Sequence, residues 1–119
     1  IKGVLNGMVA VYDQMIAQGR GHVINISSIY GNFPVTGAAV YGASKAAVNF
    51  VMSTLAMELR GRGITVMSLH PGWVDTDMGG SMAPLKPADS IAGMKQVIAS
   101  ASLATSGQFI GWDGKPVPW

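Results

Sequence analysis

The sequence contains no cysteine and few charged residues. Without cysteine, a disulfide framework and any chemistry based on a thiolate are excluded. Charged side chains make up 12% of the 119 residues, about half of the ~25% that is usual in globular proteins, whereas 49% of the residues are hydrophobic. A chain this apolar collapses in water, so intrinsic disorder is excluded, and much of the surface is predicted to be buried against other protein.

Long hydrophobic runs and clusters of like charge are also missing. The most apolar stretch is interrupted by Asn49, Ser53, Thr54 and Glu58, and is shorter than the ~20 residues that a membrane span requires. The eight lysine and arginine residues are scattered, with no stripe that could follow a nucleic-acid backbone. No signal-peptide pattern opens the sequence, so we expect a cytoplasmic protein.

Apolar periodicity and glycine breaks predict three helices and three strands in alternation. Residues 2–18 and 41–60 repeat apolar side chains at helical spacing, and the second of these helices is apolar on nearly every side, as in a helix packed between two partners. Short apolar runs at 22–27, 64–69 and 108–112 are typical of buried parallel strands. Pro87 begins the third helix, with a predicted apolar stripe of Ile91, Met94, Val97 and Ile98. This alternation indicates a layered α/β fold with right-handed crossovers.

Tyr41 and Lys45 open the second helix and carry the clearest chemical signal. Residues four apart lie on one face of a helix, so the phenol and the ammonium are neighbours. An isolated phenol is too weak an acid to exchange protons at neutral pH, but a nearby ammonium favours the phenolate form. The pair therefore predicts an acid–base catalyst.

Two loops are expected to meet this pair at one edge of the sheet. Ser28 follows the first strand, and Pro71-Gly72-Trp73-Val74-Asp75-Thr76 follows the second. Ligands of open α/β sheets bind outside the carboxyl ends of the strands. Ser28, Tyr41 and Thr76 are therefore predicted to converge.

Together, three motifs resemble the second half of a short-chain dehydrogenase/reductase: Asn25-Ile26-Ser27-Ser28, Tyr41-xxx-Lys45 and Pro71-Gly72-xxx-Thr76. Residues 69–80 and 113–119 are similar to the C-factor-like and carbonyl-reductase-like branch, and the resemblance covers essentially the whole sequence. It implies the C-terminal half of a Rossmann-like, doubly wound parallel sheet. No Gly-x-x-x-Gly-x-Gly phosphate loop occurs in residues 1–119, so we expect the N-terminal dinucleotide-binding half to lie outside them, and residues 1–119 to be inactive alone.

The resemblance also implies a chemistry, namely reduction of a ketone or aldehyde, or oxidation of the alcohol, with NAD or NADP. Tyr41 would exchange the proton with the carbonyl oxygen, Lys45 would bind the nicotinamide ribose, and Ser28 would orient the carbonyl. The nicotinamide would be held by Pro71, Gly72, Val74 and Thr76, with Tyr41 and Lys45. The substrate pocket is predicted to be apolar, with walls from Ile29, Phe33, Pro34, Trp73, Met78 and Met82.

Two further interpretations stay open beside the enzyme. Relatives pair the helices equivalent to 2–18 and 41–60 into a four-helix bundle, which implies a homodimer or homotetramer. A truncated, non-catalytic domain could act through these helices alone, as a scaffold or signal. In the other interpretation, a separate polypeptide supplies the phosphate-binding half of a two-chain enzyme.

Neither His22 nor His70 has acidic partners at ligand spacing, which predicts no metal site.

Overall fold

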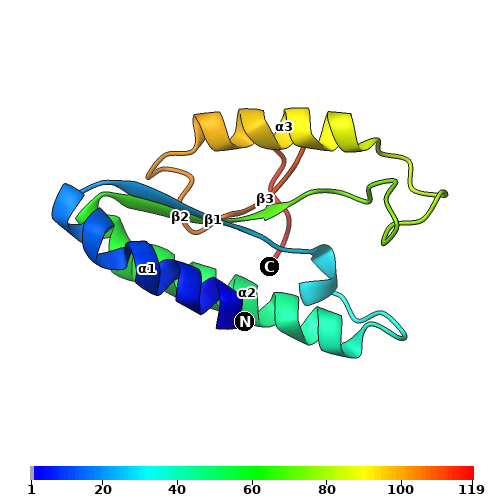
Figure 1. The fold of residues 1–119 in the computed structure, drawn as a ribbon, viewed down its shortest axis with the longest axis horizontal. Coiled ribbons are helices and arrows are strands. Elements are labelled where there is room, and N and C mark those ends of the chain that lie inside the picture. Colours follow the sequence, from blue (N-terminus) through cyan, green and yellow to red (C-terminus); the bar gives the residue numbers. More distant parts are fainter. Residues whose placement is uncertain (1) are drawn as a thin grey trace.

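The computed structural model describes residues 2–119 and alternates helices with strands (Figure 1). Helix α1 spans Lys2–Gln18, strand β1 Gly21–Ile26, helix α2 Ala39–Leu59, strand β2 Ile64–His70, helix α3 Pro87–Ser100 and strand β3 Phe109–Gly111. Two short 3-10 helices complete the order, η1 at Ile29–Gly31 and η2 at Arg60–Arg62. All three helices and all three strands predicted from the sequence are confirmed, and α2 begins two residues earlier than predicted.

The three strands form one parallel sheet in the order β1-β2-β3. Strand β1 pairs with β2 from Gly21 opposite Ile64 to Ile26 opposite Leu69. Strand β3 pairs only with the last three residues of β2, from Ser68 opposite Phe109 to His70 opposite Gly111. The parallel α/β architecture predicted from the short apolar strands is therefore confirmed.

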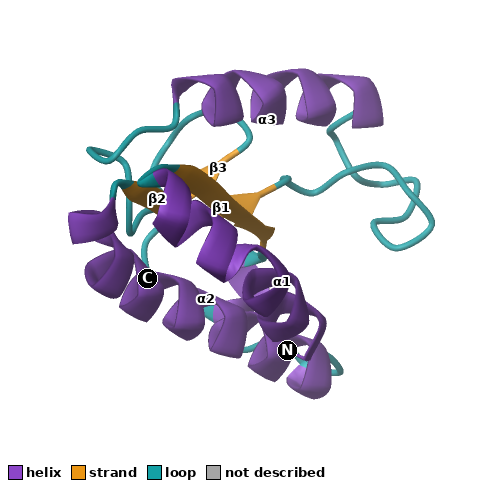
Figure 2. Cartoon of the chain, turned by 60° about the vertical axis from the view of Figure 1, so that its left-hand side comes forward, coloured by secondary structure: helices purple, strands orange, loops and turns teal. Residues whose placement is uncertain are grey.

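Helices cover both faces of the sheet (Figures 1 and 2): α1 and α2 lie on one face and α3 on the other. The side chains of β2 alternate between two cores, which explains why this strand is apolar almost throughout. On the first face, Ile64 and Val66 pack with buried residues of α2. On the second, Met67 and Leu69 pack with Val97 of α3 and with β3.

The third strand is shorter than the predicted 108–112. The chain turns at Asp113–Gly114 and comes back, so that Ile110 forms an antiparallel bridge with Pro116 and the Gly111 N–H donates to the Lys115 carbonyl at 2.8 Å. These bonds fold the last residues of the chain back over β3. The last bond to β2 is donated by the Trp112 N–H to the His70 carbonyl at 2.8 Å.

Only part of the apolar stripe predicted for α3 is buried in the core. Val97 is buried, whereas Ile91 is 55% and Ile98 41% exposed. Ser90 is buried instead, because its hydroxyl donates to the Pro71 carbonyl at 2.6 Å. That bond fixes the start of α3 over the loop that leaves β2. Among residues 2–119, none of the helices is long and apolar enough to cross a lipid bilayer.

Candidate active site

A cavity of about 660 Å³ opens at the carboxyl ends of β1 and β2. Its walls come from the turn after β1, the start of α2, the loop after β2 and the first turns of α3. This is the edge at which parallel α/β sheets bind ligands. The lining residues are Ser27, Ser28, Ile29, Tyr30, Ala38, Tyr41, His70, Pro71, Gly72, Trp73, Val74, Thr76, Met78, Gly79, Pro87, Ser90, Ile91 and Met94.

Ser28 lies at the N-terminus of the η1 turn, immediately after β1. Its backbone is extended, and its Oγ accepts a hydrogen bond from the Tyr30 N–H at 3.2 Å. The side chain is only 8% exposed and lines the cavity. Because the Oγ acts as acceptor in that bond, the hydroxyl hydrogen can still be donated to a ligand.

Tyr41 and Lys45 lie one turn apart on α2. The Lys45 ammonium lies 5.6 Å from the centre of the Tyr41 ring and donates to the Ile26 carbonyl, at the end of β1, at 3.1 Å. The Tyr41 ring lines the cavity and packs edge-to-face with Tyr30, with 6.3 Å between the ring centres. A positive charge is therefore held beside the phenol, as the four-residue spacing predicts.

Two glycines allow the Ser28 turn to touch the backbone of α2. A Cβ added to Gly31 would lie 2.8 Å from the Ala46 nitrogen, and one added to Gly42 would lie 2.7 Å from the Tyr30 oxygen. Both distances are shorter than side-chain carbons tolerate. The turn that carries Ser28 and the helix that carries Tyr41 therefore meet with no side chain between them.

The loop after β2 is closed by its own hydrogen bonds. The Trp73 indole N–H donates to the Gly79 carbonyl at 2.8 Å, and the Gly79 N–H donates to the Thr76 Oγ1 at 3.1 Å. The Thr76 hydroxyl donates in turn to the Val74 carbonyl at 3.3 Å. The Thr76 hydroxyl thus stabilises the turn itself, and its remaining lone pair is left for a ligand.

The same loop is fastened at its far end by a bridge between Val74 and Leu85 and by an ion pair between Lys86 and Asp75 at 2.7 Å. The hydrogen bond to Asp75 raises the pKa of Lys86. Lys86 is exposed, so the pair lies at the surface and contributes no charge to the cavity wall.

His70 also lines the cavity, although the sequence predicts no ligand role for it. It ends β2, its ring packs against Phe109 at 6.2 Å, and its Nδ1 is buried without a hydrogen-bond partner. Burial lowers the pKa of His70, and the Asp113 carboxylate opposes this in part. A neutral imidazole therefore lies in the wall of the cavity at neutral pH. Within residues 2–119, no three His, Asp or Glu side chains are grouped as metal ligands.

The six predicted pocket residues divide into two groups of three. Ile29, Trp73 and Met78 line the cavity. Phe33, Pro34 and Met82 lie in the exposed loops beyond it, and none of the three is among the lining residues. In their place, Ile91 and Met94 of α3 form part of the wall; their helical spacing made them indistinguishable from core residues in the sequence.

Comparison with known proteins connects this geometry to a family. Residues 1–86 match the family model for short chain dehydrogenases. The sequence is 45% identical over 83 residues to the C-signal protein of Myxococcus xanthus, covering 70% of this chain and 50% of that protein. It is 31% identical to an uncharacterized oxidoreductase of Schizosaccharomyces pombe, covering all of this chain and 55% of that protein. The chain thus spans about half the length of these curated relatives.

Solved structures of similar fold include two carbonyl reductases. The carbonyl reductase Sniffer of D. melanogaster superposes with a TM-score of 0.76 at 40% identity, over 82% of this chain and 41% of that one. An NADPH-bound carbonyl reductase from chicken fatty liver superposes with a TM-score of 0.76 at 35% identity, over 88% of this chain and 47% of that one.

Proposed function

Because the chain belongs to the short-chain dehydrogenase family, we propose that it carries the catalytic residues of an NAD(P)-dependent reductase acting on a ketone or aldehyde. One observation carries the proposal. Ser28 and Tyr41 line one cavity, Lys45 lies beside the Tyr41 ring on α2, and the backbone contact through Gly31 and Gly42 holds the Ser28 turn against that helix.

Each of the three side chains has a role that its contacts support. The Ser28 hydroxyl donates to the substrate carbonyl and orients it, since its Oγ is the acceptor in the bond from the Tyr30 N–H and its hydrogen stays free. Tyr41 donates its phenolic proton to the carbonyl oxygen during reduction and takes it back during oxidation. The Lys45 ammonium, beside the Tyr41 ring, stabilises the phenolate that this transfer leaves.

The residues around the cavity fit a nicotinamide cofactor. The Lys45 ammonium uses one donor on the Ile26 carbonyl, which leaves two for the hydroxyls of a ribose. The wall from Pro71 to Val74 is shaped by Gly72, which has φ +88°; a Cβ there would lie 2.6 Å from Leu85 and 2.8 Å from Trp112. Pro71, Gly72, Val74 and Thr76 would hold the nicotinamide. When bound, the cofactor supplies or accepts the hydride.

We propose that residues 1–119 alone do not turn over substrate, because they contain no Gly-x-x-x-Gly-x-Gly loop for the cofactor phosphates. The same residues leave the choice between NAD and NADP open. The solved relatives described with a bound cofactor include NADPH-bound and NADP-bound proteins.

The substrate we propose is an uncharged, largely apolar carbonyl compound. Among residues 2–119, no aspartate, glutamate, lysine or arginine lines the cavity, and its wall includes Trp73, Met78 and Ile91. A substrate carboxylate would lose its hydration there without gaining an ion pair.

The proposal also includes assembly into a homodimer or homotetramer through α1 and α2. Outward-facing apolar side chains remain on both helices: Val9 is 76% exposed on α1, and Val40, Phe50 and Met57 are 73–86% exposed on α2. Phe50 and Met57 are seven residues apart, as are Val40 and Ala47, which is the repeat of a helix-packing seam. The second candidate function, association without catalysis, rests on this same surface.

The test is oxidation of NADH and NADPH by the whole native polypeptide that contains these residues. An aryl ketone and a keto acid of similar size are supplied as matched substrates. We expect kcat/KM at least tenfold higher for the uncharged ketone. An intact polypeptide mass of 12.4 kDa with no NAD(P)H binding would instead favour the non-catalytic alternative.

A further inference from the structure

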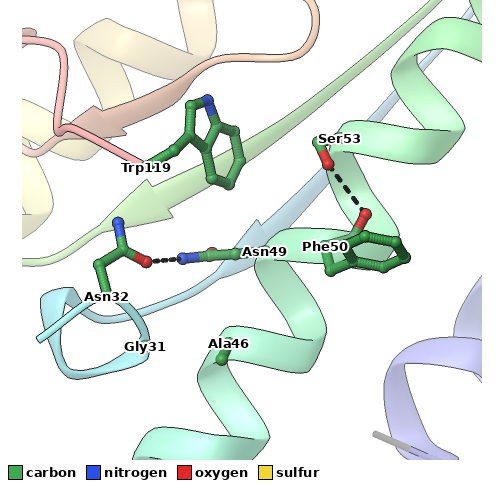
Figure 3. A pocket seen from close by; sticks show the side chains of 7 residues that line it. All are labelled: Gly31, Asn32, Ala46, Asn49, Phe50, Ser53 and Trp119. Atoms are coloured by element: carbon green, nitrogen blue, oxygen red, sulfur yellow. Dashed lines mark hydrogen bonds between the residues drawn. The ribbon is translucent and has the colours of Figure 1, made fainter. Parts of the chain in front are cut away.

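A pair of asparagines joins α2 to the end of the Ser28 turn. Asn49 lies one helical turn after Lys45, on the same face of α2, and is only 3% exposed. Its Nδ2 donates to the Oδ1 of Asn32 at 3.0 Å (Figure 3). Asn32 is the residue that ends η1, where its own N–H donates to the Ile29 carbonyl at 2.9 Å.

Asn32 also reaches a third part of the chain. Its Nδ2 donates to the carbonyl of Pro118, in the segment that folds back after β3. The neighbouring Val117 N–H donates to the Phe109 carbonyl at 2.7 Å, so this segment is itself tied to the sheet. One side-chain amide therefore connects α2, the Ser28 turn and the end of the chain.

The hydrogen bond between the two asparagines does not by itself explain why a polar residue is buried at position 49. Asn49 lies between the core residues Val48 and Met52, and its Oδ1 is buried with no hydrogen-bond partner. A buried acceptor left unpaired costs free energy, whereas an apolar side chain of similar size at the same place would not carry that cost. A polar group kept at such a cost calls for another explanation.

The space beside the two asparagines suggests why they are polar. A second cavity, of about 340 Å³, is lined by Gly31, Asn32, Ala46, Asn49, Phe50, Ser53 and Trp119. Figure 3 shows the two hydrogen-bonded amides side by side, with the Trp119 ring above them. Since this side of η1 borders open space, packing alone does not hold the turn there, and the hydrogen bond restrains it.

Resting on the proposed function, we propose that Asn32 and Asn49 are positioning residues that fix the Ser28 turn against the Tyr41–Lys45 face of α2. Ser28 begins η1 and Asn32 ends it, so a restraint at Asn32 acts on the same short turn. Gly31 and Gly42 bring the backbones of η1 and α2 into contact, and the hydrogen bond between the two asparagine side chains sets the angle at which they meet. A misplacement of about 1 Å at a reacting group can lower the rate by up to ~10²-fold.

The main test is Asn49→Leu in the whole native polypeptide, which removes the donor and keeps the number and branching of the side-chain heavy atoms. The matched control is Asn6→Leu, at an exposed position on α1. We expect kcat to fall about tenfold in Asn49→Leu with KM changed less than twofold, because Ser28 acts in the transition state. The control should keep the parent kcat, and a parent-like kcat in Asn49→Leu would overturn the proposal.

A conservative variant separates the two bonds of Asn32. Asn32→Asp keeps an acceptor for Asn49 and loses the donor to Pro118. We expect it to retain most of the kcat, which a general loss of packing would not permit. If Asn49→Leu fails to fold by circular dichroism, Asn32→Ala replaces it, since Asn32 is only half-buried.

A spectroscopic measurement keeps the proposal separate from the proposed function. The Tyr30 ring packs against the Tyr41 ring, so its proton resonances carry a ring-current shift that reports how η1 meets α2. In Asn49→Leu this shift should move toward the denatured value, and in Asn6→Leu it should not. If no carbonyl is turned over by the parent, the proposed function fails while this shift still decides the positioning role. An unchanged Tyr30 shift in Asn49→Leu would contradict it.

Discussion

The two loops that frame the cavity differ in how far they depend on a neighbouring helix. The loop from Pro71 to Lys86 is closed by hydrogen bonds among its own residues, such as Trp73 to Gly79 and Asp75 to Leu85. The turn from Ser28 to Asn32 has its own 3-10 hydrogen bonds, but it is also held from outside, by the backbone of α2 and by Asn49. Changes in α2 should therefore alter the position of Ser28, whereas the loop after β2 should keep its shape.

Among changes to the two loops, Gly31→Ala is expected to have the largest effect on stability. The added Cβ would lie 2.8 Å from the Ala46 nitrogen, so η1 would have to separate from α2. We expect a loss of about 1–3 kcal/mol in the free energy of unfolding, measured in urea. The matched control, Gly7→Ala on α1, has open space around the new methyl and should raise stability by ~0.5–1 kcal/mol. Equal stability of the two variants would show that the backbone contact is not tight.

Thr76→Val should disturb only the loop after β2. The substitution removes the acceptor of the Gly79 N–H and the donor to the Val74 carbonyl. For these exposed bonds we expect a cost of about 0.5–1 kcal/mol in unfolding free energy and faster hydrogen exchange at the Gly79 amide. Exchange at Tyr30, in the other turn, should not change. A change at Tyr30 would mean that the two loops are coupled, and would contradict the view that they are held independently.

The stability of the fold should depend on pH because of His70, which lines the cavity between the two loops. Burial lowers the pKa of this imidazole in the folded state, so at low pH the unfolded chain binds a proton that the folded chain resists. Stability should therefore be level above pH ~6.5, the usual histidine value, and fall as the pH drops below it, until the folded pKa is passed. In His70→Gln this part of the slope should vanish, and in the control His22→Gln it should persist. The Asp113 carboxylate, which faces His70, limits the fall.

The smallest effect is expected from Lys86→Gln. The ion pair with Asp75 is exposed, with 68% of the Lys86 side chain accessible, so water and salt screen it. The urea midpoint should match that of the parent within error, at low salt and at high salt alike. A clear salt-dependent loss would show that the ion pair, rather than the hydrogen bonds of the loop, holds its far end.

Much of this arrangement could be predicted from the sequence, because its signals are local. The strands are short apolar runs bounded by glycine, so their bounds were predicted to within one or two residues. The Tyr41–Lys45 pair depends only on helical spacing, and its closeness to one sheet edge follows from parallel pairing. Each of these signals lies within a short stretch of sequence, and the general rules of parallel sheets supply the rest.

The features that escaped prediction all depend on distant segments. Ile91 and Met94 repeat like core residues, and only the position of α3 over the loop shows that they face the cavity. His70 ends a buried strand and has no local sign of its place in the wall. The bond between Asn32 and Asn49 requires the η1 turn and the α2 helix to be in place first. Phe33, Pro34 and Met82 were predicted to line the pocket from their place in the loops alone, and none of the three is among the lining residues.

The most direct test of catalysis at this edge of the sheet uses Tyr41→Phe in the whole native polypeptide. The turnover of an uncharged aryl ketone by this variant is compared with that by the parent. The variant keeps the ring beside Lys45 and removes only the proton that Tyr41 would transfer. We predict that kcat falls by ~10²–10⁴-fold, the usual contribution of general acid catalysis, while NAD(P)H binding is retained. Tyr12→Phe, on the outer face of α1, should leave kcat unchanged. A kcat in Tyr41→Phe within twofold of the parent value would contradict the assignment of Tyr41 as the proton donor.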